Sequence, residues 1–182
     1  DCTSLKDLDL QGLMSPSDTL TYIGESAFNN CISLETLTIP DPIYFIDDHA
    51  FANCESLTHI YFSDSVQFID YGAFSGCKSL KLVDFPKSLN YVNRNAFSCR
   101  FLSPENGLDI SPGDVESIQG HRFIGYDANH LYRADSIVNI KVVQDEKVLY
   151  EGEMASGTPC VLGNILPKIP ENSKLESYKI VG

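Results

Sequence analysis

The stretch IDYGAFSGCKSL, Ile69 to Leu80, decides the fold, because close copies of it recur along the chain. Its Ala-Phe pair returns every 23 residues, and the apolar and cysteine positions around the pair recur at the same spacing. A repeat of about 20 to 29 residues cannot bury its own apolar side, so it predicts a solenoid of stacked coils. The recurring positions are Ala27-Phe28, Ala50-Phe51, Ala73-Phe74 and Ala96-Phe97; Cys31, Cys54 and Cys77; Leu34, Leu57 and Leu80; and Ile23, Ile46, Ile69 and Val92.

Within one repeat, the apolar spacing predicts a short strand followed by a turn and a second apolar segment. Ile60 and Phe62 alternate with His59 and Tyr61, so the first pair is expected to face the core and the second pair the solvent. Residues 70–74 are expected to form a short helical or 3₁₀ turn that leads back to the start of the coil. Stacking brings equivalent residues together, which predicts a buried column of Phe28, Phe51, Phe74 and Phe97.

The segment Cys31 to Pro40, CISLETLTIP, resembles the repeat of the BspA-like leucine-rich repeat family, C-x-S-L-x-x-I-x-I-P-x-x-V-x-x-I-x-x-x-A-F. The resemblance covers Cys2 to Ser98. It implies an α/β leucine-rich repeat solenoid that is right-handed and strand-rich, with a parallel sheet on one face. It also implies a secreted or cell-surface bacterial protein with a role in adhesion or host interaction. Because the chain begins at a repeat cysteine, we expect it to start within a longer solenoid.

The repeat becomes irregular at both ends. The first unit holds six additional residues, which we place in a bulge at Gly12 to Asp18. We divide the chain into a repeat array, residues 1–98, and a segment of degenerate repeats with a β-rich C-terminal cap, residues 99–182. Residues 108–123 fit a fifth coil, and residues 136–142 fit a sixth strand. Alternatively, two β-rich runs around the polar link QDEK, residues 144–147, predict a hairpin in the cap.

The charge and hydropathy of the chain exclude two classes of partner. The formal net charge is −12 and no basic block interrupts it, so binding to nucleic acid or to an anionic membrane surface is not expected. No run approaches the roughly 18 apolar residues that a membrane span requires, so no membrane insertion is expected.

No pattern of catalytic or metal-binding residues is present. The cysteines of the repeat share one column, which is typical of buried, reduced core thiols. A pair between Cys99 and Cys160 is left open. The chain has no C-x-x-C or H-x-x-x-H pair, no catalytic arrangement of its histidines and no phosphate-binding loop, so we expect neither enzyme activity nor a cofactor or metal. Acidic residues in the repeat turns are expected to cap turns rather than to bind calcium: Asp41, Asp47, Asp48 and Asp64.

Recognition of another macromolecule is therefore the expected function. We expect a protein partner, such as a host surface protein, to bind the solvent-facing strand positions. A row of aromatic residues before the second apolar segment of each coil is either a packed ladder or an exposed strip that could stack on glycans. Glycan binding by this row is the alternative to a protein partner, and a structural spacer in a longer surface protein is the third possible function. The predicted strand-face residues are Thr36, Thr38, His59, Tyr61, Leu82 and Asp84, with Asp7 and Asp9 before them, and the aromatic row is Tyr22, Phe45, Phe68 and Tyr91.

Overall fold

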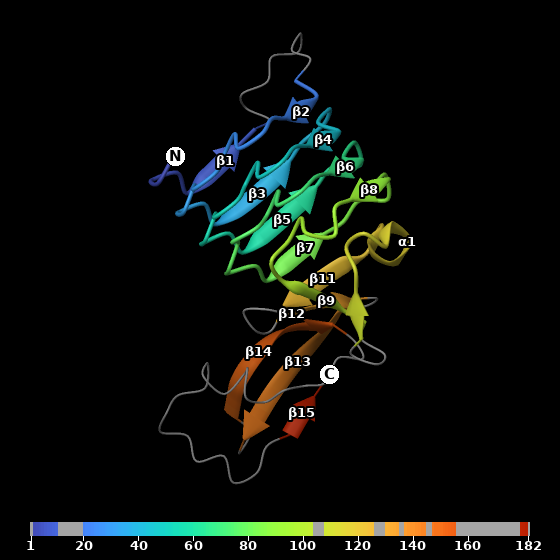
Figure 1. Cartoon of the computed structure of the whole chain (residues 1–182). Helices are drawn as coiled ribbons and strands as arrows, with labels where there is room; N and C mark the ends of the chain where they lie inside the picture. Colours follow the sequence, from blue (N-terminus) through green and yellow to red (C-terminus); the bar gives the residue numbers. More distant parts are fainter. Residues whose placement is uncertain are drawn as a thin grey trace.

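The computed structural model describes residues 2–10, 20–103, 108–125, 130–134, 137–144, 147–155 and 179–181. The strands in these ranges form three sheets, of eight, four and three strands. Figure 1 shows their arrangement. Within the described residues, the four-residue α1 (Val115–Ile118) is the only helix. The strand-rich solenoid with a parallel sheet along one face is confirmed.

The eight-stranded sheet begins with four parallel strands, one from each coil. Thr36 lies opposite His59, and His59 lies opposite Leu82, so the register follows the 23-residue repeat. Asp7 lies opposite Thr36, so β1 keeps the same register although the first coil is longer than the others. The bulge predicted at residues 12–18 lies outside the described residues. These strands are β1 (Asp7–Asp9), β3 (Thr36–Ile39), β5 (His59–Phe62) and β7 (Leu82–Asp84).

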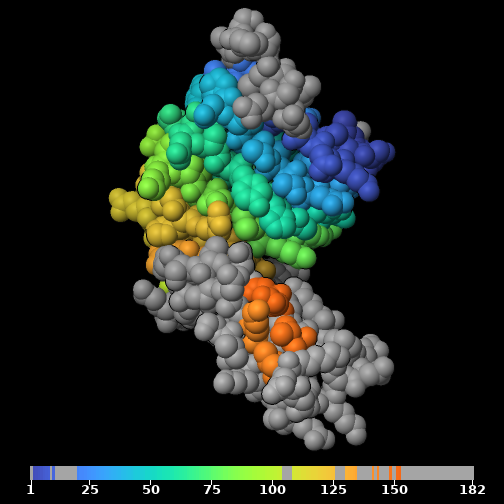
Figure 2. Space-filling model, turned by 180° about the vertical axis from the view of Figure 1, so that it is seen from behind, coloured from blue at the N-terminus to red at the C-terminus, as the bar shows by residue number. Residues whose placement is uncertain are grey.

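A second parallel sheet runs along another side of the coils. Its strands are two residues long, and in each the second residue is buried while the first is exposed or half-buried. Figure 2 shows the coils from behind as adjoining bands in chain order. The strands are β2 (Tyr22–Ile23), β4 (Phe45–Ile46), β6 (Phe68–Ile69) and β8 (Tyr91–Val92).

Backbone hydrogen bonds also join the coils at the Ala-Phe turns. The Phe51 N–H donates to the Ala73 carbonyl at 2.8 Å, and the Phe74 N–H donates to the Ala96 carbonyl at 2.7 Å. The chain forms turns here rather than a helix. Gly72 has φ of 62°, and a Cβ on it would lie 2.7 Å from His49 Nε2. Glycine therefore suits this position for two reasons: it adopts the left-handed backbone readily, and it has no Cβ to clash with the His49 ring.

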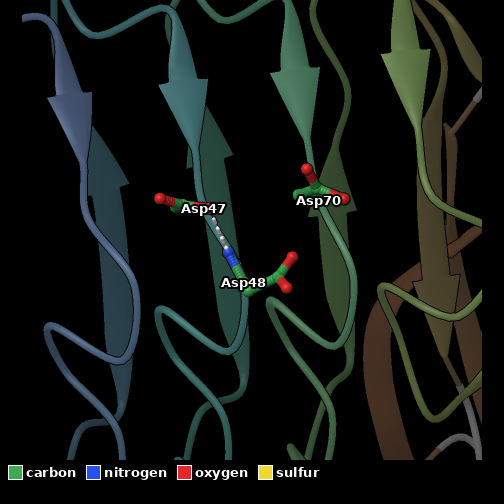
Figure 3. A group of neighbouring side chains, drawn as sticks. All are labelled: Asp47, Asp48 and Asp70. Atoms are coloured by element: carbon green, nitrogen blue, oxygen red, sulfur yellow. Dashed lines mark hydrogen bonds between the residues drawn. The ribbon is translucent and has the colours of Figure 1, made fainter.

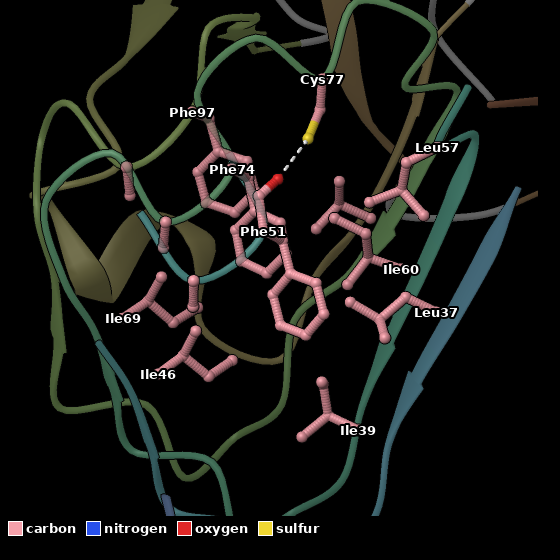
Figure 4. Packing of buried hydrophobic residues seen from close by; sticks show 14 of the residues in the cluster. Leu37, Ile39, Ile46, Phe51, Leu57, Ile60, Ile69, Phe74, Cys77 and Phe97 are labelled. Carbon is pink, nitrogen blue, oxygen red and sulfur yellow. Dashed lines mark hydrogen bonds between the residues drawn. The ribbon is translucent and has the colours of Figure 1, made fainter. Parts of the chain in front are cut away.

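The phenylalanine column of the Ala-Phe turns forms the centre of the core (Figure 4). Phe74 is fully buried, and its ring stacks on Phe51 at 5.5 Å and on Phe97 at 5.0 Å, with interplanar angles of 2° and 12°. Phe28 stacks on Phe51 at 5.1 Å but is only partly buried. The expected stack is confirmed, whereas full burial of Phe28 is wrong, because Phe28 is the first phenylalanine of the stack and no described ring packs on its other side.

The cysteine column is also buried. The Cys54 thiol donates to the Phe28 carbonyl at 3.4 Å, and the Cys77 thiol donates to the Phe51 carbonyl at 3.3 Å, the bond drawn in Figure 4. Cys31, Cys54 and Cys77 are free thiols, as predicted. Cys99 is also free, and Cys160 lies outside the described residues.

Beyond β7 the chain reverses direction. β11 (Arg122–Gly125) pairs antiparallel with β7, and Phe123 lies opposite Val83 in the core. The fifth coil predicted at residues 108–123 is therefore wrong, because Phe123 lies in a strand and not in an Ala-Phe turn. The remaining strands of this sheet are β12 (His130–Ala134), β9 (Arg100–Leu102) and β10 (Asp109–Ile110), in the spatial order β7, β11, β12, β9, β10.

The C-terminal strands form a separate three-stranded sheet. β13 (Ile137–Gln144) pairs antiparallel with β14 (Lys147–Ala155) and with β15 (Lys179–Val181). The predicted hairpin is confirmed, and the predicted sixth strand of the solenoid is wrong. In Figure 1 this sheet lies at the end of the molecule opposite to β1 and β2.

Candidate binding face

The solvent side of β1, β3, β5 and β7 carries the predicted strand-face residues in two rows. One row holds Asp7, Thr36, His59 and Leu82, and the other holds Thr38, Tyr61 and Asp84, as the strand register requires. The alternating residues Leu37, Ile60 and Val83 are fully buried, so the two rows face away from the core. Asp9 pairs with Thr38, but its side chain lies outside the described residues. The structure brings together the residues that the sequence predicted for this face.

His59 and Tyr61 form an aromatic pair on this face. Their rings lie almost parallel, with centroids 6.3 Å apart and planes inclined by 13°. Both residues are half-buried, so part of each remains accessible to solvent. Such a pair offers a rigid apolar surface together with polar edges.

A hydrogen-bond chain fixes the tautomer of His59. The Thr58 hydroxyl donates its only hydrogen to the Glu35 carbonyl at 2.8 Å. Thr58 Oγ1 also lies 2.7 Å from His59 Nδ1, so in this contact it must accept, and Nδ1 carries the proton. In the neutral ring, Nε2 is then a hydrogen-bond acceptor.

The surroundings of His59 favour this neutral ring. Burial lowers the pKa of the His59 imidazole below its ordinary value, and the positive charge of Lys81 lowers the pKa further. At neutral pH the strand face therefore presents an uncharged imidazole with a lone pair on Nε2.

A groove opens beside Tyr61, where β3 and β5 end. It has a volume of about 260 Å³. Asp41 lies in the turn after β3, and its Oδ1 accepts a hydrogen bond from the Ser65 hydroxyl. The sequence predicted the turn at Asp41 but not the groove, because the apolar pattern does not give the path of the loops. The lining residues are Thr38, Ile39, Pro40, Asp41, Tyr61, Phe62 and Ser63.

The carboxylate of Asp84 is already engaged within the chain. Arg122, which lies opposite Asp84 on β11, forms an ion pair with it, and Arg122 Nε donates to Asp84 Oδ2 at 3.1 Å. Asp84 was predicted as a binding residue of the strand face, and this is corrected here, because its carboxylate is paired with Arg122. The repeat pattern could not show the pair, since it does not place β11 beside β7. The ion pair forms an edge of the parallel part of the face.

The aromatic row lies on the second sheet. Tyr22, Phe45, Phe68 and Tyr91 are paired in register along β2, β4, β6 and β8. The two ends of the row are open, since Tyr22 is 54% and Tyr91 is 44% exposed, whereas Phe45 and Phe68 are half-buried and 6.2 Å apart. The row is thus a packed pair between two exposed tyrosines, and its use as a binding surface stays a prediction.

Three half-buried carboxylates gather where β4 and β6 end (Figure 3). Ligand atoms of Asp47, Asp48 and Asp70 lie within 4.8 Å of one another. Two of these groups close turns, because Asp47 Oδ1 accepts from the Asp48 N–H at 2.8 Å and Asp70 Oδ1 accepts from the Tyr71 N–H at 2.7 Å. Asp47 and Asp70 are equivalent residues of successive repeats, so these contacts have the turn-capping role expected from the sequence.

In the part of the chain that the structure describes, no helix is long and apolar enough to cross a membrane.

Comparison with protein families matches residues 1–125 to the BspA type leucine rich repeat region, in six copies. Among solved structures, the T. pallidum leucine rich repeat protein is 28% identical, with a TM-score of 0.46, over 50% of this chain and 44% of its own. A leucine rich cell surface protein from Faecalibacterium prausnitzii is 30% identical, with a TM-score of 0.43, over 47% of this chain and 24% of its own. The chain spans less than half the length of both proteins. Comparison with curated proteins gives no match.

Proposed function

The chain belongs to the BspA type leucine-rich repeat family, and we propose that it is a non-enzymatic recognition module that binds a protein partner through the strand face. The observation that carries this proposal is the stacked pair of His59 and Tyr61 among the outward residues of four parallel strands. Aromatic residues are enriched where proteins bind one another. We place the module on a secreted or cell-surface bacterial protein, as the resemblance to BspA-like surface proteins implies, with a role in adhesion or binding to a host protein.

The composition of the face supports a protein partner. Thr36 and Thr38 offer hydroxyls, Leu82 offers an apolar side chain, and His59 offers the acceptor Nε2 beside the Tyr61 ring. A centre of aromatic and apolar side chains with polar groups around it is the usual arrangement of a protein interface. The lateral spacing of strands, about 4.8 Å, spreads these groups over a continuous surface.

Glycan binding by the aromatic row is the second candidate. The exposed rings of Tyr22 and Tyr91 favour it, since open aromatic faces can stack on sugar rings. A structural spacer is the third candidate, and it requires no ligand for either surface.

Paired variants on the two surfaces test these alternatives. The protein would be tested by pull-down against host surface proteins and on a glycan array. The strand-face variant combines His59→Ala with Tyr61→Thr, and the second change copies Thr38, the equivalent residue of the neighbouring coil. The matched control on the other sheet combines Tyr22→Ser with Tyr91→Ser.

We expect the strand-face variant to weaken binding of a captured protein partner about tenfold or more, because aromatic residues at an interface centre dominate affinity. Its melting temperature should stay close to that of the parent protein, since neither side chain belongs to the buried core. Binding that survives the strand-face change but is lost in the Tyr22 and Tyr91 variant contradicts the proposal and favours the glycan alternative. Absence of binding in both assays favours the spacer.

A further inference from the structure

The groove beside Tyr61 carries a negative charge that no described residue of its lining balances. Asp41 is exposed, and among the described residues none forms an ion pair with its carboxylate. Oδ1 accepts from the Ser65 hydroxyl, and no hydrogen bond from the described part of the chain reaches Oδ2. In the part of the chain that the structure describes, the other lining residues include no cation. The groove therefore offers a carboxylate oxygen to an incoming donor.

The walls of the groove add an aromatic ring and hydroxyl groups. Tyr61 is half-buried on one wall, and Thr38 is exposed on the adjacent strand. Ser63 lies in the turn that follows β5 and also lines the opening. The residues that line this opening of about 260 Å³ thus include an aspartate, a tyrosine and two residues with neutral hydroxyls, beside the apolar Ile39, Pro40 and Phe62.

The charge around the groove favours a ligand that carries a positive charge. The whole chain has a net charge of −12, and the equivalent turn of the next coil carries another carboxylate, Asp64. Lys87 is the next residue in this series of turns and is two repeats from Asp41. An anionic ligand would meet repulsion here, whereas a cationic side chain would meet a favourable field.

We propose that this groove binds an arginine side chain of the protein partner, with the guanidinium against the Tyr61 ring and its N–H groups donating to Asp41 and the neighbouring hydroxyls. This inference rests on the proposed function, because it assumes a protein on the strand face. A guanidinium is planar, carries five N–H donors and stacks on aromatic rings, so it matches the polar groups and the ring that line the opening. A lysine ammonium would also be attracted by the charge and the ring, but it lacks the planar surface that stacks on the ring and has fewer donors.

The probe is the blocked peptide acetyl-Gly-Arg-Gly-amide, titrated into isotope-labelled protein and followed by NMR shifts of the Asp41 and Tyr61 amides. The comparison peptide carries citrulline, which keeps the shape of arginine but not its charge. We expect the arginine peptide to bind about three- to fivefold more tightly than the citrulline peptide, since an exposed charge pair contributes a modest free energy.

Two aspartate variants make the test specific to the groove. Asp41→Asn keeps an oxygen that can accept from Ser65 but removes the charge, so it should abolish the preference for arginine over citrulline. Asp64→Asn removes the same charge from the equivalent turn outside the groove, so it should keep most of the preference. Equal binding of both peptides to the parent protein, or an equal effect of the two variants, overturns the inference. So does the absence of a titratable shift at about 20 mM arginine peptide, which would put the dissociation constant well above 1 mM.

Titration with simple methyl glycosides separates this inference from glycan binding. Shifts of Asp41 and Tyr61 with a glycoside but not with the arginine peptide also overturn it. The proposed function is judged separately, by the effect of the His59 and Tyr61 variant on a captured protein. If that variant loses the partner while Asp41→Asn keeps full affinity, protein recognition stands and the arginine groove fails.

Discussion

Removing one ring from the middle of the phenylalanine column should lower stability far more than removing the ring at its end. Phe74 is fully buried, stacks on a ring on each side, and touches Phe62 edge-on at 5.9 Å. Truncating a fully buried phenylalanine costs about 3–5 kcal/mol, because transfer energy is lost and a cavity is left. The ring pairs on both faces place Phe74→Ala near the upper end, about 4–5 kcal/mol. Phe28 is partly exposed and, among the described residues, stacks on one ring only, so Phe28→Ala should cost about 1–2 kcal/mol.

Urea unfolding measures this difference. With a slope of about 2 kcal/mol per molar urea, Phe74→Ala should lower the midpoint by about 2 M and Phe28→Ala by about 0.5–1 M. The chain has nine tyrosines and no tryptophan, so tyrosine fluorescence and far-UV circular dichroism are suitable probes. Both probes are needed, because the end coil of a repeat protein can open before the rest.

Equal costs for the two substitutions would refute the reasoning, since the expected difference depends on the position of each ring within the stack. A cost below about 1 kcal/mol for Phe74→Ala would also refute it, because a fully buried ring cannot be removed so cheaply unless the core repacks. Phe97→Ala provides an independent check, since Phe97 stacks on Phe74 and also meets Phe101 edge-on at 5.2 Å.

Three further predictions concern the thiols, His59 and the Ala-Phe turns. The buried cysteines Cys31, Cys54 and Cys77 should react with a thiol reagent in the native state much more slowly than exposed Cys2; rapid labelling, or their recovery as disulfides by mass mapping, contradicts this. Cys77 should be especially slow, since the neighbouring Cys54 thiol and burial raise the pKa of the Cys77 thiol well above its ordinary value. The His59 imidazole should titrate below about 6.5 in an NMR experiment, and Lys81→Gln should move the midpoint upward. Because the pKa of His59 is depressed in the folded state, its contribution to the free energy of unfolding is present above about pH 6.5 and is lost as the pH falls through the folded pKa. An NMR titration midpoint of His59 at or above about 6.5 contradicts the lowered pKa. Gly72→Ala should destabilise the protein by about 1–2 kcal/mol, because the added Cβ would lie 2.7 Å from the His49 ring on a left-handed backbone. Combining it with His49→Ala should remove part of that cost. If the two substitutions have additive effects in thermal unfolding, this contact is excluded.

The stacked coils could be predicted from the sequence because parallel pairing repeats the same contact at each copy. Thr36, His59 and Leu82 occupy equivalent positions of the repeat, and their strands pair in that register. A slip by one residue would turn the alternating core side chains toward solvent, so burial of the core selects this register. The two outward rows of the strand face follow from the same register. The division of the chain at residues 98 and 99 stays a prediction.

The cap could not be predicted in this way, because apolar spacing does not give the direction of a strand. Phe123 has the spacing of Phe74 from the apolar residues before it, which suggested another coil. In the structure Phe123 enters the core from an antiparallel strand and meets Phe85 and Phe101 edge-on, at 5.7 Å and 5.0 Å. A ring from an antiparallel strand thus packs into the core beyond the fourth coil, and its apolar spacing in the sequence is the same as that of a ring from another coil.

The reversal also determines where the candidate binding face ends. Arg122 comes to lie beside Asp84 only because β11 runs antiparallel to β7, and the resulting ion pair uses the carboxylate that the repeat alone would leave open. The groove and the pair of His59 and Tyr61 lie one or two coils away, on β3 and β5, and share the side chain of Tyr61. A partner that places an arginine beside Asp41 would therefore contact the aromatic pair as well. For this reason we expect Asp41→Asn to weaken binding of a protein partner less than the combined change at His59 and Tyr61, since it removes one polar contact and leaves the aromatic surface intact.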